Sequence, residues 1–385
     1  MTMRRIFLLR LFPAGLPFSS RRTHTAPVRA IRPRAARSSS RSRFYNRLVT
    51  EMATTIKDLA QETGLSLATI SSYINGGNVR EKNRQKIESA IQKHGYVVNE
   101  MARSLKTNKS MTIGIIVPEL KSNFFANIIS EAEDILRHHG YSVLVCDCRT
   151  DPEREQDAVD FLLRKRVDGI INAPVTHDGR HLRQFFDEGK AVVLIDRKIE
   201  CISCDCVIVD NINAVRKAVR TLVENGHTKI GYIGGPQSVY TSAQRTLGYK
   251  YAMEENGLPV EDRLVVEGNF TIQGGADAMT HLVRTNPDMS AVIATNDEMT
   301  VGCMIAANEM DLRIPGDISI IGFDHLDFSR ACSPRLTIIS QPSLEIARCA
   351  SSLLLRRLAG DTGATEELRL STSITSGKSI AKLNG

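Results

Sequence analysis

Residues 54–77 read TTIKDLAQETGLSLATISSYINGG and carry two short helical patterns separated by a glycine. Thr55 and Asp58 have the spacing of a capping box at the start of a helix, and Gly64 can end that helix. Ser66 can then cap a second helix. Two short helices joined by a glycine-containing turn predict a helix-turn-helix, whose second helix enters the major groove of DNA.

The expected second helix, residues 67–75, has one apolar face and one face of small residues. Ile70 and Ile74 are spaced to point inward. The outward positions are Leu67, Ala68, Ser71 and Ser72. A third helix is expected over 81–94, with Ile87, Ala90 and Ile91 inward and Gly95 closing it. A plain three-helix bundle for protein contact is the alternative, which the small outer face and the basic character of the head disfavour.

The net charge of +7 is unevenly distributed along the chain. Residues 1–51 contain twelve arginines, no lysine and one acidic residue. Residues 52–110 carry four more basic than acidic residues, whereas residues 111–385 carry eight more acidic than basic ones. A basic head on an acidic body is the pattern expected where the head alone binds phosphates.

Residues 1–51 are rich in Arg, Ser and Pro and show no apolar periodicity. Their composition resembles a mitochondrial transit peptide, and Ile6–Phe12 resembles a short signal peptide interrupted by Arg10. A third interpretation, translation from a misassigned start, is favoured because Met52 directly precedes a well-formed helix start. In each case a disordered or non-native leader is expected. No apolar run reaches the roughly 20 residues that would span a bilayer, so no membrane partner is expected.

The eight cysteines are scattered and do not resemble a disulfide framework. The spacing of Cys201, Cys204 and Cys206 resembles a metal site, but no matched second pair is close in sequence. Reduced thiols in a loop are therefore expected, with no metal and no other cofactor.

From Met111 the pattern changes to alternating strands and helices. Residues 112–117 form an apolar run, as in a buried parallel strand. Further strands are expected at 141–146, 169–171, 191–195, 229–233, 264–267, 291–294 and 318–323. Helices are expected at 125–139, 153–166, 181–188, 214–225, 243–256, 272–284 and 298–308. Two such series predict two doubly wound lobes, with a ligand cleft between them at the carboxyl ends of the strands.

Polar and aromatic side chains follow several of these strands. The candidates for a ligand site are Asp196, Arg245, Phe270, Asn296 and Asp324. Carboxylates, an amide and a guanidinium suit a polyhydroxylated ligand, because each can pair with hydroxyls. For the acidic residues, helix capping or a loop salt bridge is the alternative role, and for Asp297 the capping and ligand roles both stay open.

These motifs resemble the lactose/galactose repressor (LacI) family over residues 54–380. In the head the matching positions are 55–60, 64–66, 68–71, 75–76, Gly95-Tyr96, Asn99 and Ala102-Arg103-Ser104-Leu105. In the body they include residues 122–125, Asp168-Gly169, Asp210-Asn211, Gly226-His227, Arg245, Asn296-Asp297 and 322–324.

The resemblance implies which residues bind DNA. Leu67, Ala68 and Ser72 would contact bases or the groove, while Thr69, Ser71 and Asn75 would contact phosphates, and Thr55 and Ile56 lie at the start of the same motif. Ala102, Leu105 and Lys106 belong to an expected hinge helix, in which Leu105 would wedge into the minor groove and bend the site. A buried core leucine is the alternative for Leu105.

The resemblance also implies an effector site. Positions matching Arg245, Asn296 and Asp324 would bind the effector and Phe270 would stack on it, with Phe124 and Asp196 beside them. Three residues depart from the family pattern: Ser72 replaces a frequent long base reader, Arg80 a frequent helix-capping serine, and Asn123 a common proline.

The expected protein has an all-α helix-turn-helix head and a two-lobed α/β body similar to type I periplasmic binding proteins. Its expected parts are the leader 1–51, head 52–98, hinge 99–110 and body 111–385, with lobe one at 111–210 and 341–372 and lobe two at 211–340 and 373–385.

The expected function is a bacterial, cytoplasmic, nucleoid-associated regulator, most simply a repressor. As a homodimer, with a tetramer left open, it would bind double-stranded operator DNA under control of a sugar-like effector. A periplasmic-type solute-binding protein is the alternative. An enzyme is not expected, because no catalytic motif is present.

Overall fold

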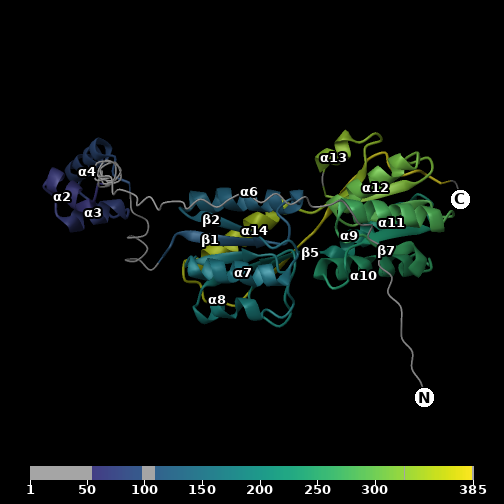
Figure 1. Cartoon of the computed structure of the whole chain (residues 1–385), viewed down its shortest axis with the longest axis horizontal. Coiled ribbons are helices and arrows are strands. Elements are labelled where there is room, and N and C mark those ends of the chain that lie inside the picture. The colour runs from purple at the N-terminus through teal and green to yellow at the C-terminus, as the bar shows by residue number, and fades with distance from the viewer. Residues whose placement is uncertain (1–53, 98–108, 325, 384–385) are drawn as a thin grey trace, which may run out of the picture. The chain divides into compact units, whose positions relative to one another are not determined.

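The computed structural model describes residues 54–97, 109–324 and 326–383. The chain divides into two compact units, Met1–Val98 and Asn99–Gly385, which correspond to a head and a body. Figure 1 shows a small group of helices in the first unit and two sheets with flanking helices in the second. No helix in the described ranges is both long enough and apolar enough to cross a bilayer.

The head contains α2 (Ile56–Thr63), α3 (Leu67–Ile74) and α4 (Glu81–His94). Thr55 and Asp58 form the expected capping box, and Gly64 ends α2 at a φ of 66°. The Ser66 side chain accepts a hydrogen bond from the Thr69 amide at the start of α3. The three helices pack around Leu59, Ile70, Ile87 and Ala90, all of which are buried. The predicted helix-turn-helix is therefore confirmed, together with its caps.

The first sheet of the body, here lobe one, has the strand order β11-β5-β4-β3-β1-β2 and all its pairs are parallel. Its strands are β1 (Thr112–Val117), β2 (Ser142–Asp147), β3 (Gly169–Asn172), β4 (Ala191–Ile195), β5 (Asp205–Val209) and β11 (Glu367–Leu370). Its helices are α6 (Asn123–His138), α7 (Pro152–Arg164), η1 (Arg180–Leu182), α8 (Arg183–Asp187) and α14 (Ser343–Leu358).

The second sheet, here lobe two, has the order β12-β10-β9-β8-β6-β7, with only β12 antiparallel to its neighbour. Its strands are β6 (Ile230–Gly234), β7 (Val265–Glu267), β8 (Ala291–Ala294), β9 (Ser319–Phe323), β10 (Thr337–Ser340) and β12 (Ser373–Thr375). Its helices are α9 (Asn211–Glu224), α10 (Tyr240–Glu255), η2 (Asp262–Leu264), α11 (Ile272–Thr285), α12 (Asp297–Glu309) and α13 (Leu326–Ala331).

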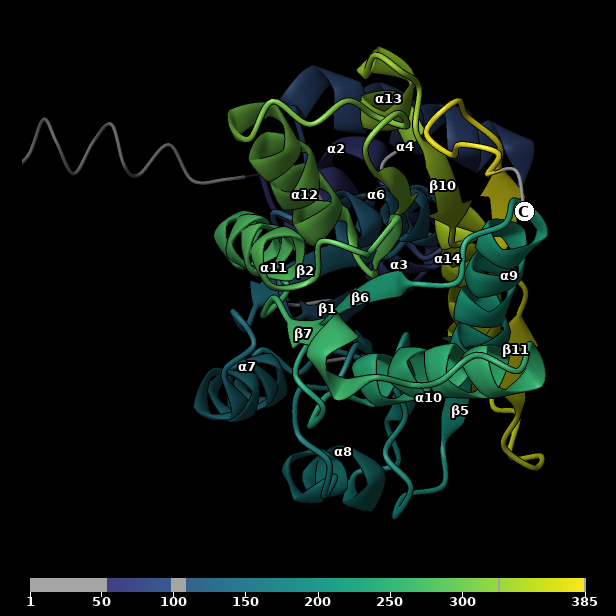
Figure 2. The ribbon, with the colours of Figure 1, turned by 90° about the vertical axis from the view of Figure 1, so that its right-hand side faces the viewer.

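Each sheet is covered on both faces, because successive side chains of a strand point to opposite sides. In lobe two, Tyr232 packs with α9 and α10, whereas its neighbour Ile233 packs with α11 and α12. Figure 2 shows these helix pairs on the two sides of the sheet. In lobe one, Ile115 faces α6 and α14, and Ile116 faces α7 and α8. The two doubly wound lobes predicted from the sequence are confirmed.

The chain crosses between the lobes three times. The crossings join β5 to α9, β10 to α14 and β11 to β12 through residues 209–211, 340–343 and 370–373. Neither lobe is therefore one continuous stretch of sequence.

Several elements were not expected. Strand β5 contains Cys206, which is buried, so the prediction that all three closely spaced thiols lie in a loop is wrong for this residue. Strands β10, β11 and β12 and helices α13 and α14 were not predicted either. All eight cysteines are free. The described ranges contain no group of three His, Cys, Asp or Glu residues able to hold a metal ion.

Candidate functional site

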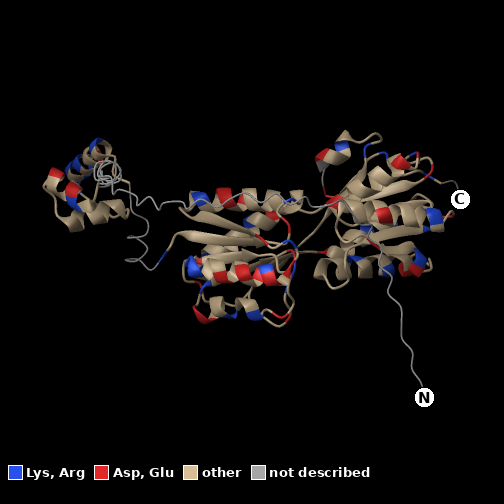
Figure 3. Cartoon of the chain, viewed as in Figure 1, with Lys and Arg blue, Asp and Glu red and all other residues tan. Residues whose placement is uncertain are grey.

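The outward face of α3 is the candidate DNA-binding surface. Leu67 is 45% exposed and Ala68 is exposed, while Ser71 and Ser72 are half-buried. This helix carries no charged residue, whereas α2 and α4 carry many (Figure 3). Any reading of DNA by α3 would therefore use apolar contacts and hydroxyl groups, with charge supplied by neighbouring elements.

The residues expected to contact phosphates also hold the ends of the helices. Thr69 shares a hydrogen bond with the Ser66 hydroxyl at 2.9 Å, and the Asn75 amide donates to the Ser71 carbonyl at 2.7 Å. The Thr55 hydroxyl donates to Asp58 at 2.8 Å, and Ile56 is the half-buried first residue of α2. Ala102, Leu105 and Lys106 lie outside the described residues.

A shallow hollow of about 410 Å³ lies beside α3. Its walls include Ala68, Thr69, Ser72, Arg80 and Asn83. Arg80 is exposed and its side chain makes no capping hydrogen bond to α4. Two of the departures from the family pattern, Ser72 and Arg80, thus lie on one hollow. The sequence alone does not predict that these two residues lie together, because only the fold brings the start of α4 beside α3.

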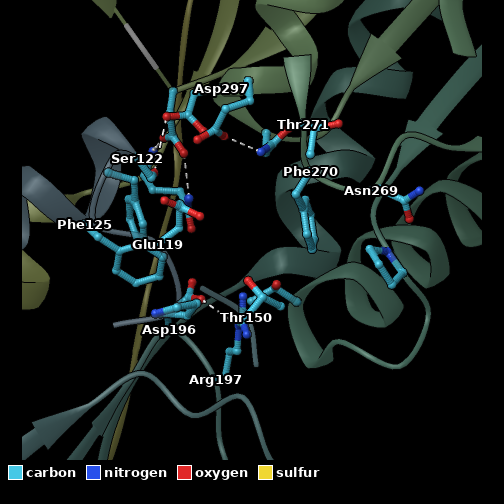
Figure 4. Close-up of a pocket in the computed structure, with 18 of the residues that line it drawn as sticks. Glu119, Ser122, Phe125, Thr150, Asp196, Arg197, Asn269, Phe270, Thr271 and Asp297 are labelled. Atoms are coloured by element: carbon cyan, nitrogen blue, oxygen red, sulfur yellow. Dashed lines mark hydrogen bonds and ion pairs between the residues drawn. The ribbon is translucent and has the colours of Figure 1, made fainter. Parts of the chain in front are cut away.

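A cavity of about 330 Å³ lies between the lobes of the body. All six residues predicted for the effector site line it: Phe124, Asp196, Arg245, Phe270, Asn296 and Asp324. Lobe one supplies the first two and lobe two the other four. Figure 4 shows Phe125 and Phe270 on opposite sides of the cavity, with Asp196 and Arg197 on one wall and Asp297 on another.

Arg245, on α10, is the most connected of these residues. Its guanidinium donates to Asn211 Oδ1 at 2.7 Å, to the Thr295 carbonyl at 2.5 Å and to Gln341 Oε1 at 3.2 Å. It also lies 4.2 Å from the centre of the Phe323 ring. With 4% exposure it is nearly fully buried. These contacts fix one orientation of the guanidinium at the cavity wall.

Asp324 follows β9 and is held by Gln341, which follows β10. The Gln341 backbone amide donates to Asp324 Oδ1 at 2.9 Å, and its side-chain amide donates to Oδ2 at 2.7 Å. Burial raises the pKa of the Asp324 carboxyl to about 6. Its φ of 53° is unusual for a residue other than glycine. Because β10 was not predicted, sequence reasoning missed Gln341.

On the wall from lobe one, Asp196 and Arg197 follow β4. Asp196 Oδ2 lies 3.3 Å from Arg197 Nε, and both side chains are more than nine-tenths buried. Burial raises the pKa of the Asp196 carboxyl, and the neighbouring Arg197 and Arg245 oppose that rise. The φ of Asp196 is 63°, so the end of this strand is also strained.

Asn296, the residue before Asp297, caps α12. Asn296 is the N-cap, since its side-chain oxygen accepts from the Met299 amide at 2.9 Å, and its side-chain nitrogen donates to Glu298 at 2.5 Å. Asp297 does not cap the helix. Instead, its carboxylate accepts from the Ser122 hydroxyl of lobe one at 3.4 Å, so this contact crosses between the lobes.

Glu298 is a cavity residue that sequence reasoning missed. Burial and the neighbouring Asp297 raise the pKa of its carboxyl to about 9, and Glu119 adds to this effect. Two buried carboxyls this close favour holding a proton between them, because ionising both would place two like charges side by side. The cavity thus combines several buried carboxyl groups with the guanidinium groups of Arg197 and Arg245.

Aromatic rings complete the walls. Phe124 and Phe125 meet edge to face with centroids 5.0 Å apart. Phe270, at a φ of 56°, lies over Gly235 so closely that a Cβ there would be 2.1 Å from its Cζ. Only glycine leaves room for this ring. Apolar ring faces with polar groups around them suit a sugar, whose carbon skeleton and hydroxyls need both.

Comparisons with known proteins agree with this geometry. Residues 55–99 match the family described as bacterial regulatory proteins, lacI family. Residues 110–376 match the periplasmic binding proteins and sugar binding domain of the LacI family.

A curated relative is the HTH-type transcriptional repressor CytR of Escherichia coli (strain K12). It is 34% identical over 315 residues, which cover 80% of this chain and 91% of the relative.

Solved structures give the same result. The lac repressor dimer bound to operator and the anti-inducer ONPF has a TM-score of 0.77 and 25% identity, covering 85% of this chain and 99% of that one. A LacI family transcriptional regulator from Enterococcus faecium with bound ribose has a TM-score of 0.65 and 27% identity, covering 71% and 100%. The chain therefore belongs to the lacI family of bacterial regulatory proteins and is a DNA-binding transcription regulator rather than an enzyme.

Proposed function

We propose that this regulator is a dimeric repressor whose affinity for a pseudo-palindromic operator is set by a sugar or sugar derivative bound between the lobes. The observation that carries this proposal is the cavity itself, whose walls come from both lobes. A ligand touching both walls has different contacts when the lobes change their relative angle, so it favours one arrangement over the other. The dimer is proposed from likeness to the lac repressor dimer.

The effector contacts are proposed for six residues. Arg245 and Asp324 would bind vicinal hydroxyls, because each presents a fixed, paired set of hydrogen-bonding atoms. Phe270 would cover one face of the ring and Phe124 would close the opposite wall. Asp196 would act from lobe one, and the Asn296 side-chain nitrogen would donate to the ligand once the Glu298 side chain turns away from it. The ribose-bound relative supports a sugar of pentose size or a compound containing one.

The DNA contacts are proposed for α3 and its surroundings. Leu67, Ala68 and Ser72 would face the bases, while Thr55, Ile56, Thr69, Ser71 and Asn75 would lie along the backbone. To these we add Arg80, because it is exposed beside Ser72 and can supply the charge that α3 lacks. Its guanidinium can reach a phosphate or a guanine edge.

We assign a separate role in this function to each part of the chain. The head 52–98 would bind DNA, and the hinge 99–110, with Ala102, Leu105 and Lys106, would contact the minor groove. The body 111–385 would sense the effector and form the dimer, with the lobes at 111–210 and 341–372, and at 211–340 and 373–385. The protein would act on the bacterial nucleoid in the cytoplasm.

Selection of DNA by the full chain tests the DNA-binding half of the proposal. A randomised duplex library is incubated with the protein, bound duplexes are amplified, and the recovered site is examined by gel shift. Recovery of a site with two related half-sites supports a dimeric regulator. Leu105→Ala should weaken binding of that site far more than binding of a scrambled duplex, and an equal loss on both would contradict the wedge.

A thermal-shift screen of pentoses, hexoses, sugar acids, phosphosugars and nucleosides tests the sensing half. A stabilising compound should also change the affinity for the selected duplex. A protein that binds a sugar but selects no duplex would instead be a solute-binding protein, and that outcome would contradict the proposal.

A further inference from the structure

We propose that Asp168 holds the segment through which the body is joined to the DNA-binding head, and that specific DNA binding depends on this hold. The inference rests on the proposed function, because it concerns how one lobe acts on that segment. Asp168 lies directly before β3, at the end of lobe one opposite to the cavity residues of β4. It is a positioning residue, since nothing in the proposal brings it to DNA or effector.

The two oxygens of the Asp168 carboxylate accept hydrogen bonds from two consecutive residues of that segment. Oδ1 accepts from the Ser110 amide at 2.7 Å and from the Ser110 hydroxyl at 3.0 Å, and Oδ2 accepts from the Met111 amide at 2.9 Å. All three partners are donors, so a carboxylate fits and an amide would not, because its nitrogen is itself a donor.

The Asp168 carboxylate supports an unusual backbone conformation at Met111. Its φ is 51°, a left-handed conformation that a methionine rarely adopts without support from its surroundings. The Met111 carbonyl is already part of the sheet, since the Ser142 amide donates to it at 2.8 Å. The backbone thus turns at Met111, between the start of β1 and the segment leading to the head, and Asp168 holds both residues of the turn.

Strand β3 connects this turn to the effector cavity. All four of its residues are buried, and it pairs with β1 on one side and β4 on the other. At its far end, Arg197 of the cavity wall donates to the Pro174 carbonyl at 3.3 Å. Because a buried strand moves with its sheet, the Asp168 contacts keep Ser110 in a fixed orientation to lobe one during any rotation of that lobe that accompanies ligand binding.

The Asp168 side chain lies at the edge of lobe one rather than in its core, which makes the inference testable. It is half-buried and belongs to neither hydrophobic cluster of lobe one. With Lys109 it lines an open hollow of about 790 Å³. Loss of the carboxylate would therefore leave the lobe folded and give the segment room to move.

The test uses the full chain and two duplexes, one selected by the wild-type protein from a randomised library and a scrambled duplex of equal length. Asp168→Ala should weaken binding of the selected duplex roughly 10- to 100-fold, as expected for loss of a hydrogen bond to a charged group. Binding of the scrambled duplex should change less than about twofold, since non-specific binding depends on the basic head. Asp168→Asn should fall between Asp168→Ala and the wild type.

Asp157→Asn is the matched control, because Asp157 is an exposed acid of α7 in the same lobe and the change removes the same charge. It should behave as the wild type on both duplexes. Equal losses of Asp168→Ala on the two duplexes, or no loss on either, would overturn the proposal. Should Asp168→Ala fail to fold, Ser110→Ala tests the same contact from its other side. It should lower specific binding about three- to tenfold, and unchanged specific binding would overturn the proposal.

Hydrogen exchange separates this inference from the proposed function. In the free protein, the amides of Ser110 and Met111 should exchange faster in Asp168→Ala than in Asp157→Asn. Unchanged exchange would refute the hold itself. A wild-type protein that selects no duplex would refute the proposed function, while the exchange result would still support or overturn the hold.

Discussion

Replacing Arg245 with lysine should weaken effector binding and lower the stability of the body, although the positive charge is kept. The three hydrogen bonds of the guanidinium go to Asn211, Thr295 and Gln341. A lysine ammonium lacks the planar fork and can reach at most one or two of these acceptors. Each buried acceptor left without a donor costs about 1–3 kcal/mol. The free energy of unfolding of the body should therefore fall by roughly 2–4 kcal/mol, and effector affinity should fall at least tenfold.

Denaturant unfolding measures the first effect, and titration with the best compound from the thermal-shift screen measures the second. Arg313→Lys is the control, because Arg313 pairs with Asp317 at the exposed surface, where ion pairs contribute little to stability. Binding of the selected duplex without effector should be unchanged in Arg245→Lys, since none of the three acceptors of Arg245 belongs to the head or to the segment that Asp168 holds. A variant that responds normally to the effector would refute the assignment of the cavity as the sensing site.

Three further predictions concern the cavity. Because burial raises the pKa of Asp324 to about 6, its contribution to stability should be present below about pH 4 and lost as the pH rises through about 6. Unfolding by urea at several pH values should show this dependence in the wild type and not in Asp324→Asn, and parallel curves would contradict it. Glu298→Gln should leave effector affinity at pH 7 within about threefold, because burial and the neighbouring Asp297 raise the pKa of this carboxyl and so favour its neutral form; a large loss in calorimetric titration would show that the ionised form is needed. Gly235→Ala should lower effector affinity roughly tenfold or more by displacing Phe270, whereas Gly316→Ala, where the nearest atom would be 3.4 Å away, should match the wild type.

The head was predictable because its structure is local. Thr55, Asp58, Gly64 and Ser66 each act within one helical turn of their own position, and the structure uses all four as expected. The inward positions followed from helical spacing. What spacing could not supply was the approach of Arg80 to Ser72, because the chain from α3 to α4 has no regular period.

The body was predictable where strands are buried on both faces and long helices follow them. Strands β11 and β12 were missed because they lie at sheet edges, are short and are only half-buried, so they have no continuous apolar run. Strand β5 is fully buried, but it begins at Asp205 among the closely spaced cysteines, whose spacing resembles a metal site more than a strand.

The six cavity residues could be predicted because the carboxyl ends of parallel strands lie at the same edge of a sheet. Glu298 and Gln341 were not, since the first lies inside a helix and the second follows an unexpected strand. Asn296 shows a further limit. It was predicted only as a ligand residue, with the capping role left open for Asp297, but in the structure the side-chain oxygen of Asn296 is the cap and its side-chain nitrogen faces Glu298.

The three crossings between the lobes have a consequence for synthesis. Lobe one is complete only when β11 has joined β5, so it cannot close until Leu370 has left the ribosome. The head needs no residue beyond its own helices and is finished at Val97. At a synthesis rate of about 5–20 residues per second, the interval is roughly 14 to 55 s. During that time each nascent chain carries the helices of the head before the effector-binding body has folded.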